Sequence, residues 1–319
     1  MNRLMVSMDL DDAWAYQRAR GMTGWDSTRT ILPQATDAAV SVLDSAGIRE
    51  VTMFAVGRDA DTLVGARLLR ELSDNGYEIA NHSWMHRGEL PGLDLETICK
   101  DLDDTSVAIQ AATGAPVYGF RCPSFGSSPS LAEALQSLGY AYDASVFPTI
   151  LMPALRAYHR VVAGRGEAEP TYGSLRTVVA SQRIRITPGR PASIPVTTMP
   201  LLRLPVHGSY LMVLAERSPG LALTYLRVFD RLARMSRLDV SFLIHPTDVL
   251  DSIEAPELGF FPGMGMNSAK KRPVLESALS LLAEGRRSTR TVEAATQAHW
   301  GSRFRRASAS AADHSQGAQ

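Results

Sequence analysis

The stretch Leu4-Met-Val-Ser-Met-Asp-Leu-Asp-Asp12 decides the fold, because it joins a short apolar run to a group of acidic residues. A mainly apolar run of this length is typical of a buried strand. Because side chains alternate along a strand, Asp9 and Asp11 should lie on one face, at its C-terminal end. Acidic residues in such places also serve as turn residues or helix N-caps, so this stretch alone does not predict a functional site.

A second apolar run, Gly76-Tyr-Glu-Ile-Ala80, is followed by Asn81-His-Ser-Trp-Met-His86. This run is also typical of a strand, and it would bring His82 and His86 to the same edge of a sheet as the aspartates. In parallel α/β folds, chemistry is built at the edge formed by the carboxyl ends of the strands. Two histidines four residues apart can bind one ion from a single turn, although an isolated pair is more often two ordinary histidines.

The two stretches together supply ligand types for a divalent, zinc-like ion and leave one carboxylate spare. An ion with three protein ligands keeps a position open for water, lowers the pKa of that water and polarises a carbonyl. The spare carboxylate can take the proton of the water. The combination therefore predicts a hydrolase of amides or esters. Zn²⁺ is the expected ion, with Co²⁺, Ni²⁺ or Fe²⁺ as alternatives.

Two further segments are Gly119-Phe-Arg-Cys-Pro-Ser-Phe125 and Ser241-Phe-Leu-Ile-His-Pro246. Taken in order with the first two, they resemble the motifs of the polysaccharide deacetylases that share the NodB homology domain, carbohydrate esterase family 4. The pattern of that family is an aspartate pair, then H-S/T-x-x-H, then R-x-P-x-F/Y, then a strand that ends in Leu/Ile-x-His-Pro. The resemblance covers about residues 1–145 and 238–295, and it implies a distorted (β/α) barrel.

The resemblance also implies a role for each matching residue. Asp9 corresponds to the catalytic base, Arg121 to the residue that orients this base, and His245 to the general acid. The implied metal ligands are Asp11, His82 and His86, with Asp12 as an alternative to Asp11 because a third acidic residue follows the pair. The implied substrate contacts are Pro123, Phe125 and Asp143, although the tryptophan often found after the position of Asp143 is absent.

Physical chemistry supports two of these roles independently. An arginine at a strand end can clamp a carboxylate through two hydrogen bonds and keep it ionised, although most arginines there are surface residues. A histidine at the end of the apolar run Val240-Ser-Phe-Leu-Ile244 can protonate a departing amine near neutral pH. His159, His207, His299 and His314 have no comparable sequence context.

Composition limits the class of protein. The chain has 319 residues, of which 45% are hydrophobic, so one large α/β domain over residues 1–300 is expected. Equal numbers of basic and acidic residues, 33 of each, argue against nucleic acid as the main partner. Cys99 and Cys122 are expected to be free thiols of a reducing compartment. Without a recognisable targeting signal or membrane-spanning stretch, we expect a cytoplasmic protein.

Strand-like and helix-like segments alternate along the chain, which predicts a parallel sheet. Between about residues 147 and 217 this alternation fails, and we expect a loop-rich insertion there. Residues 301–319 are rich in Ser, Ala and Arg and are expected to form a disordered tail. The expected elements are a strand at Val51–Val56 and helices near Asp59–Asn75, Leu95–Ala112, Leu131–Leu138, Leu221–Arg237 and Pro273–Ala283.

Two apolar loops, Val146–Leu155 and Leu258–Met266, should follow strands and lie on the active-site face. They suggest an amphipathic substrate, such as a lipid-linked amino sugar carrying N-acetyl or N-formyl, handled in peripheral contact with the inner face of a membrane. Four basic residues could meet its phosphate: Arg203, Lys270, Lys271 and Arg272. The alternative is that both loops pack on the barrel and that these charges only keep the protein soluble.

The sequence thus predicts a metal-dependent hydrolase that removes an acetyl or formyl group from an amino sugar of a polysaccharide or lipid-linked glycan. One alternative is a non-catalytic carbohydrate-binding or regulatory protein on the same fold. The full set of candidate ligands, base and acid argues against it, because a binding protein needs none of them. Another alternative is a hydrolase of a small non-sugar amide or imide, which no residue excludes.

Overall fold

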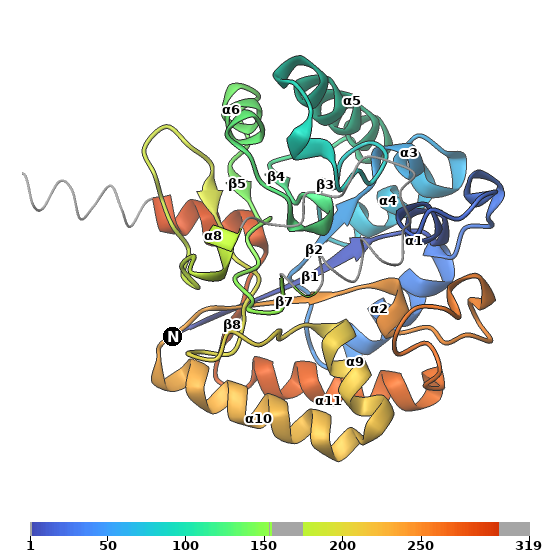
Figure 1. Cartoon of the computed structure of the whole chain (residues 1–319), viewed down its shortest axis with the longest axis vertical. Coiled ribbons are helices and arrows are strands. Elements are labelled where there is room, and N and C mark those ends of the chain that lie inside the picture. The colour runs from blue at the N-terminus through green and yellow to red at the C-terminus, as the bar shows by residue number, and fades with distance from the viewer. Residues whose placement is uncertain (1, 153, 155–174, 300–319) are drawn as a thin grey trace, which may run out of the picture.

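A curled, parallel sheet forms the centre of the molecule (Figure 1). The computed structural model describes residues 2–152, 154 and 175–299. Within these residues the strand order is β6-β5-β4-β3-β2-β1-β7, and β8 pairs with β1. Every strand pair is parallel, and the strands are β1 (Arg3–Leu10), β2 (Val51–Ala55), β3 (Glu78–Asn81), β4 (Gly119–Phe120), β5 (Tyr142–Asp143), β6 (Ala192–Ser193), β7 (Val240–Ile244) and β8 (Arg287–Ser288).

Helices cover the sheet, with α5 and α6 along one side and α10 and α11 along the opposite side (Figure 1). Both faces of the central strands are therefore buried, and β1 is buried from Leu4 to Leu10. This explains why the strands are continuous apolar runs in the sequence. The helices are α1 (Ala13–Ala19), α2 (Leu32–Ser45), α3 (Gly57–Ala60), α4 (Leu63–Asp74), α5 (Leu95–Thr113), α6 (Pro129–Ser137), α8 (Leu175–Val178), α9 (Gly208–Arg217), α10 (Pro219–Met235) and α11 (Ser268–Ala283).

Short 3-10 helices join several of these elements: η1 (Trp25–Ser27), η2 (Leu90–Gly92), η3 (Pro123–Phe125), η4 (Pro246–Asp248) and η5 (Pro256–Leu258). Together, the parallel strands and surrounding helices confirm the predicted distorted (β/α) barrel of the NodB type. Among the described residues, no helix has both the length and the apolar character needed to cross a membrane.

Two of the predicted helices have different bounds in the structure, and helix α2 lacks a predicted counterpart. The helix predicted near Asp59–Asn75 is two helices, because the Thr62 hydroxyl accepts from the Gly65 amide and begins α4 as a new helix. Helix α11 begins at Ser268, five residues before Pro273, which is accommodated inside the helix.

The described part of the segment between residues 147 and 217, which was predicted to be a loop-rich insertion, contains some regular elements. Residues 155–174 lie outside the described residues, as does the predicted tail at 301–319. The remainder supplies β6, which pairs with β5, and helix α9, which packs against α10 and β7. The described part of this segment therefore contributes β6 to the sheet, α9 beside β7 and the short helix α8.

Candidate active site

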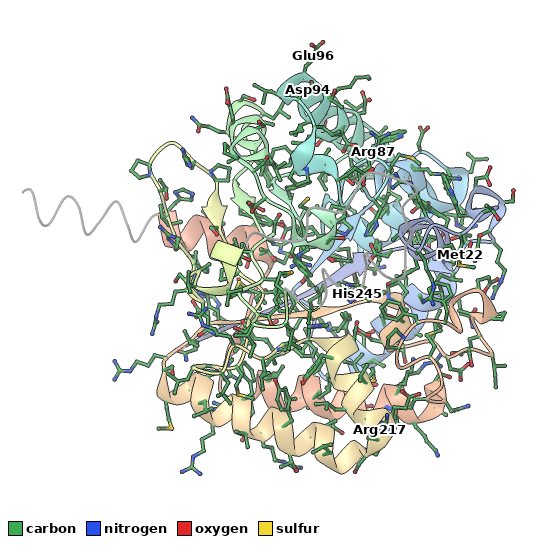
Figure 2. The ribbon with its side chains drawn as sticks, in the orientation of Figure 1. Met22, Arg87, Asp94, Glu96, Arg217 and His245 are labelled. Atoms are coloured by element: carbon green, nitrogen blue, oxygen red, sulfur yellow. The ribbon has the colours of Figure 1, made fainter. Side chains whose placement is uncertain are left out.

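The predicted catalytic and metal-binding residues come together at the carboxyl ends of four strands. Asp9 lies near the end of β1, which is flanked by β2 and β7. His82 follows β3, Arg121 follows β4 and His245 follows β7. In Figure 2, His245 lies over the middle of the sheet, whereas Arg217, at the end of α9, lies at the periphery.

Asp11, His82 and His86 form a compact group of metal-ligand atoms. Asp11 Oδ1 lies 3.4 Å from His82 Nε2 and 3.2 Å from His86 Nε2, and the three candidate ligand atoms lie within 4.8 Å of one another. Asp11 Oδ1 is buried, and it has no hydrogen-bond partner among the described residues. His82 Nδ1 is 2.7 Å from the carbonyl oxygen of Arg121, to which it can only donate. The lone pair of His82 is therefore on Nε2, facing the carboxylate, as in an imidazole that binds a metal ion.

Electrostatics also suit this group to a cation. Burial raises the pKa of Asp11, but His86 and His82 outweigh it, so the net pKa lies well below the usual range. Burial lowers the pKa of His82, but Asp9 and Asp11 outweigh it, so the net pKa is raised. A divalent cation would supply the positive charge in place of these protons. One carboxylate and two imidazoles with an orphaned buried oxygen therefore fit Zn²⁺ or a similar ion.

The turn that carries the two histidines is strained and well supported. Ser83 and His86 have positive φ angles of 65° and 49°, a conformation that is uncommon outside glycine. The Ser83 amide donates to Asn81 Oδ1 at 2.8 Å, and the Trp84 amide donates to Asp101 Oδ1 at 2.9 Å. These hydrogen bonds from β3 and α5 fix the turn that holds His86 opposite Asp11.

Asp12 has a different function in the structure. Its Oδ1 accepts hydrogen bonds from the amides of Ala13 at 2.7 Å and Ile31 at 2.8 Å, and it is the N-cap of α1. Both hydrogen bonds use Oδ1 of Asp12, the residue that was predicted as an alternative metal ligand to Asp11. Asp11 is the carboxylate that faces the two histidines.

Arg121 holds Asp9 in a buried ion pair. Its Nη1 lies 2.5 Å from Asp9 Oδ1, and its Nη2 donates to Ser7 Oγ at 3.0 Å. The guanidinium is 1% exposed and lies 4.0 Å above the ring of Phe54. The second oxygen of Asp9, Oδ2, lies 3.7 Å from His82 Nε2 and 3.8 Å from His245 Nε2. One oxygen is therefore fixed by arginine, while the other faces the space between the two imidazoles.

His245 is held by residues that the sequence analysis did not identify. Its Nδ1 lies 3.0 Å from Ser209 Oγ, and its backbone amide donates to Asp248 Oδ2 at 2.8 Å. His207 lies nearby, with its ring 6.3 Å from that of His245 and 5.5 Å from that of Phe147. Loss of solvation, reinforced by His245, lowers the pKa of His207 to about 3, so this ring is neutral. Asp248 could have been suspected from its place three residues after His245, whereas nothing in the sequence marks Ser209.

The predicted substrate contacts differ in their surroundings. Pro123 is buried, and the ring of Phe125 packs 4.8 Å from that of Phe147. Asp143 accepts hydrogen bonds from both the amide and the hydroxyl of Ser145, whose Oγ accepts from the Cys122 amide at 2.8 Å. Asp143 therefore supports the backbone next to Arg121, which is a structural function.

The loops and basic residues predicted to meet a lipid are mostly used in packing. Lys271 is fully buried and donates to the carbonyl oxygens of Thr247 and Leu250, and Arg272 pairs with Glu254. Arg203 donates to the carbonyl oxygen of Ala180. Among the described residues of the two loops, Phe147, Met152, Leu258, Met264 and Met266 are buried. The prediction that all four basic residues are available to a phosphate was wrong for Lys271, because burial and two carbonyl partners occupy it.

Known proteins were found that are similar to this chain in sequence or in fold. Residues 6–142 match the family model for polysaccharide deacetylase. A candidate polysaccharide deacetylase from Mycobacterium smegmatis has the same fold, with a TM-score of 0.59 and 15% identity over 94% of this chain and 92% of that one. No curated protein sequence matches this chain.

Two weaker structural likenesses are to proteins described as members of carbohydrate esterase family 4. One is a family 4 carbohydrate esterase from Streptomyces lividans in complex with acetate, with a TM-score of 0.43 and 15% identity over 89% of this chain and 88% of that one. The other is a family 4 pseudoenzyme from Bacillus anthracis, with a TM-score of 0.45 and 14% identity over 92% of this chain and 65% of that one. The family model thus places residues 6–142 in the polysaccharide deacetylase family, and the whole chain shares the fold of the Mycobacterium smegmatis protein.

Proposed function

We propose that this protein is a metal-dependent amidohydrolase that removes an acetyl or formyl group from the amino sugar of a glycan. The observation that carries the proposal is the position of Asp9 Oδ2, between His82 of the candidate metal group and His245. A base, an acid and a metal site thus meet within one buried cluster. A binding protein has no need for this combination.

The ion would be held by Asp11, His82 and His86, where it would polarise the amide carbonyl and lower the pKa of water. Asp9 takes the proton of the attacking water on Oδ2, because Arg121 occupies Oδ1. His245 gives a proton from Nε2 to the departing nitrogen. A C–O bond forms and the C–N bond breaks, which yields a carboxylic acid and a free amino sugar.

The decisive experiment measures metal content and acid release together. Protein purified without chelator is compared with the His82→Ala/His86→Ala variant, and acetate and formate release from N-acyl amino sugars is assayed before and after metal removal. We expect about one metal ion per wild-type chain, with loss of both metal and release in the variant. Restoration of release by added Zn²⁺ identifies the metal as the catalyst. If neither protein binds metal, the mechanism is wrong.

A lipid-linked glycan is the substrate class favoured by one exposed feature. Leu201 is 91% exposed and Leu202 59% exposed, and the carbonyl oxygen of the next residue, Arg203, accepts from the amide of Ile150, which is 47% exposed. Leu201 and Arg203 have positive φ angles, so the backbone is strained where it presents these leucines. Two exposed leucines on a constrained loop are suited to contact with a membrane that carries the substrate.

This substrate class is tested by sedimentation with anionic vesicles. We expect the wild-type protein to sediment and the Leu201→Ser/Leu202→Ser variant to remain in the supernatant. Leu63→Ser is the matched control, because Leu63 is 93% exposed on α4, and this variant should still sediment. Wild-type protein that stays in the supernatant and hydrolyses only soluble oligosaccharides would exclude the lipid-linked class.

A further inference from the structure

Three consecutive carbonyl groups of the turn that carries His86 are held by helices α3 and α1. The first two backbone amides of α3 donate to the carbonyl oxygens of Ser83 and Trp84 at 3.0 and 2.9 Å. The carbonyl oxygen of the next residue, Met85, accepts instead from Nη1 of Arg18 in α1 at 3.1 Å. The carbonyl directly before His86 is therefore held by a side chain, whereas the other two are held by backbone.

The guanidinium of Arg18 is fixed at a second point. Its Nη2 lies 3.0 Å from Glu89 Oε1, and the side chains of Arg18 and Glu89 are only 17% and 18% exposed. A planar guanidinium held by a carboxylate through one nitrogen directs its other nitrogens with little freedom. Arg18 thus bridges Met85 and Glu89, which lie on either side of His86 in the chain.

Helix α1, which carries Arg18, is itself anchored beside this turn. Trp14 is 4% exposed, and its Nε1 donates to Asp59 Oδ1 in α3 at 2.8 Å. The ring of Trp14 lies 5.8 Å from that of Trp25, and Met85 packs against the same apolar cluster. The position of Arg18 relative to the turn is therefore set by the packing of α1 as well as by its own hydrogen bonds.

Helix α1 also connects Arg18 to the carboxylate of the candidate metal group. Asp11 lies directly before the N-cap residue Asp12, and Arg18 lies in the last turn of the same seven-residue helix. His86 has a φ of 49°, a conformation that persists only where surrounding contacts hold it, and its Nε2 lies 3.2 Å from Asp11 Oδ1. The start of α1 thus follows Asp11, while the end of α1 holds the turn of His86 through Arg18.

We propose that Arg18 is a positioning residue that holds His86 in place to bind a divalent cation together with Asp11 and His82. The proposal rests on the proposed function, in which these three residues hold the ion. Because Arg18 orders the turn before the ion arrives, less order has to be gained when the ion binds. Residues that hold a metal ligand in this way change metal affinity about 10- to 100-fold when they are substituted.

The first test measures the affinity for Zn²⁺ alone, by titration of metal-free protein in competition with a coloured chelator. Arg18→Met keeps the apolar stem but cannot donate to the Met85 carbonyl, and we expect its Kd to rise about 10- to 100-fold. Glu89→Gln is the matched control, because it removes the same ion pair and leaves the contact between Arg18 and Met85 in place. Its Kd should stay near that of the wild type.

Two results of this titration would overturn the proposal. An unchanged Kd in Arg18→Met would show that the contact with Met85 does not matter for the ion. Equal losses in Arg18→Met and Glu89→Gln would assign the effect to the ion pair. Urea unfolding of the metal-free proteins should give similar free energies of unfolding for the two variants, so a difference in Kd between them reports the position of the turn.

The second test reads the turn without metal. The Arg87 amide donates to Ser83 Oγ across the turn at 3.2 Å, so its exchange with deuterium reports whether the turn is formed. In metal-free protein we expect faster exchange at residues 84–87 in Arg18→Met than in the wild type or Glu89→Gln. Wild-type protein that binds no metal overturns both proposals, whereas metal binding with unchanged exchange in Arg18→Met overturns only the role of Arg18.

Arg18→Lys covers the case in which Arg18→Met fails to fold. Lysine keeps the positive charge beside Glu89, but its single nitrogen lacks the fork that reaches both Glu89 and the Met85 carbonyl. We expect its Kd for Zn²⁺ to lie between the values of the wild type and Arg18→Met, and above that of Glu89→Gln. A wild-type Kd in Arg18→Lys would contradict the need for a guanidinium held at two points.

Discussion

His82 donates through Nδ1 to the carbonyl oxygen of Arg121 at 2.7 Å, while the guanidinium of Arg121 binds Asp9 at 2.5 Å. One residue therefore orients a candidate metal ligand with its backbone and the candidate base with its side chain. A change of the Arg121 side chain leaves the carbonyl in place, so the two functions can be separated by mutation.

Arg121→Lys should reduce turnover much more than metal binding. A lysine can make one contact with Asp9, but it cannot also reach Ser7 Oγ and stack on Phe54 in the way the planar guanidinium does. We expect kcat to fall roughly 10²-fold and metal content by elemental analysis to stay near that of the wild type. Loss of metal in the variant would show that the side chain, and not only the carbonyl, supports His82.

Asp9→Asn should retain metal and lose most of the catalytic rate. The amide cannot take a proton from water, and general-base catalysis contributes about 10²- to 10⁴-fold. His86→Ala provides the contrast, because it should lose metal as well as activity. Steady-state kinetics with metal analysis on both variants measure the difference, and a fully active Asp9→Asn enzyme would overturn the assignment of the base.

Asp11 and Asp12 should respond in opposite ways to substitution by alanine. Asp12→Ala removes two hydrogen bonds to backbone amides and the N-cap of α1, so we expect the free energy of unfolding to fall by about 1–2 kcal/mol with metal retained. Asp11→Ala should abolish metal binding. Urea unfolding and elemental analysis of each variant measure these effects, and metal loss in Asp12→Ala alone would reverse the ligand assignment.

Asp101→Asn should change stability in a pH-dependent way. Burial raises the pKa of Asp101 to about 6, although the Trp84 amide and Arg87 oppose this effect. The folded protein therefore binds a proton more readily than the unfolded chain, and the associated stability is lost as pH rises from about 4 to 6. Asparagine has no charge to bury above pH 6, and its side-chain oxygen can still accept from the Trp84 amide. Urea unfolding should show a gain of roughly 1–3 kcal/mol at pH 8 and almost none at pH 4; equal gains at both would contradict the burial argument.

Part of the site could be predicted because its residues follow apolar runs directly in the sequence. Asp9 and His82 lie at the ends of β1 and β3, where apolar runs give a clear signal. The strands on the other side of the sheet, β4, β5 and β6, have only two residues each, and so short a pattern does not specify a strand. Helix α9 was likewise missed, since it lies in a segment rich in proline and glycine.

Side-chain partners that depend on tertiary approach were not accessible from the sequence. Ser209 reaches His245 only because α9 lies against β7 and Gly208 has no side chain. The choice between Asp11 and Asp12 depended on the amide of Ile31, which comes from the start of α2. The substrate contact of Asp143 stays a prediction from resemblance, whereas its hydrogen bonds with Ser145 are local contacts that the sequence did not indicate.

The strand that carries Asp9 also determines how this protein must fold. Leu4 of β1 pairs with Val240 of β7, and Arg3 pairs with Arg287 of β8, so the first strand completes its pairing with two of the last. Closing so long a loop is entropically costly and slows folding. A nascent chain that ends before β7 would leave one edge of β1 open to pairing with other chains. We therefore expect the edge of the sheet that carries the candidate site to be assembled late, so that a partly synthesised chain would expose an unpaired strand edge and hold Asp9 without His245.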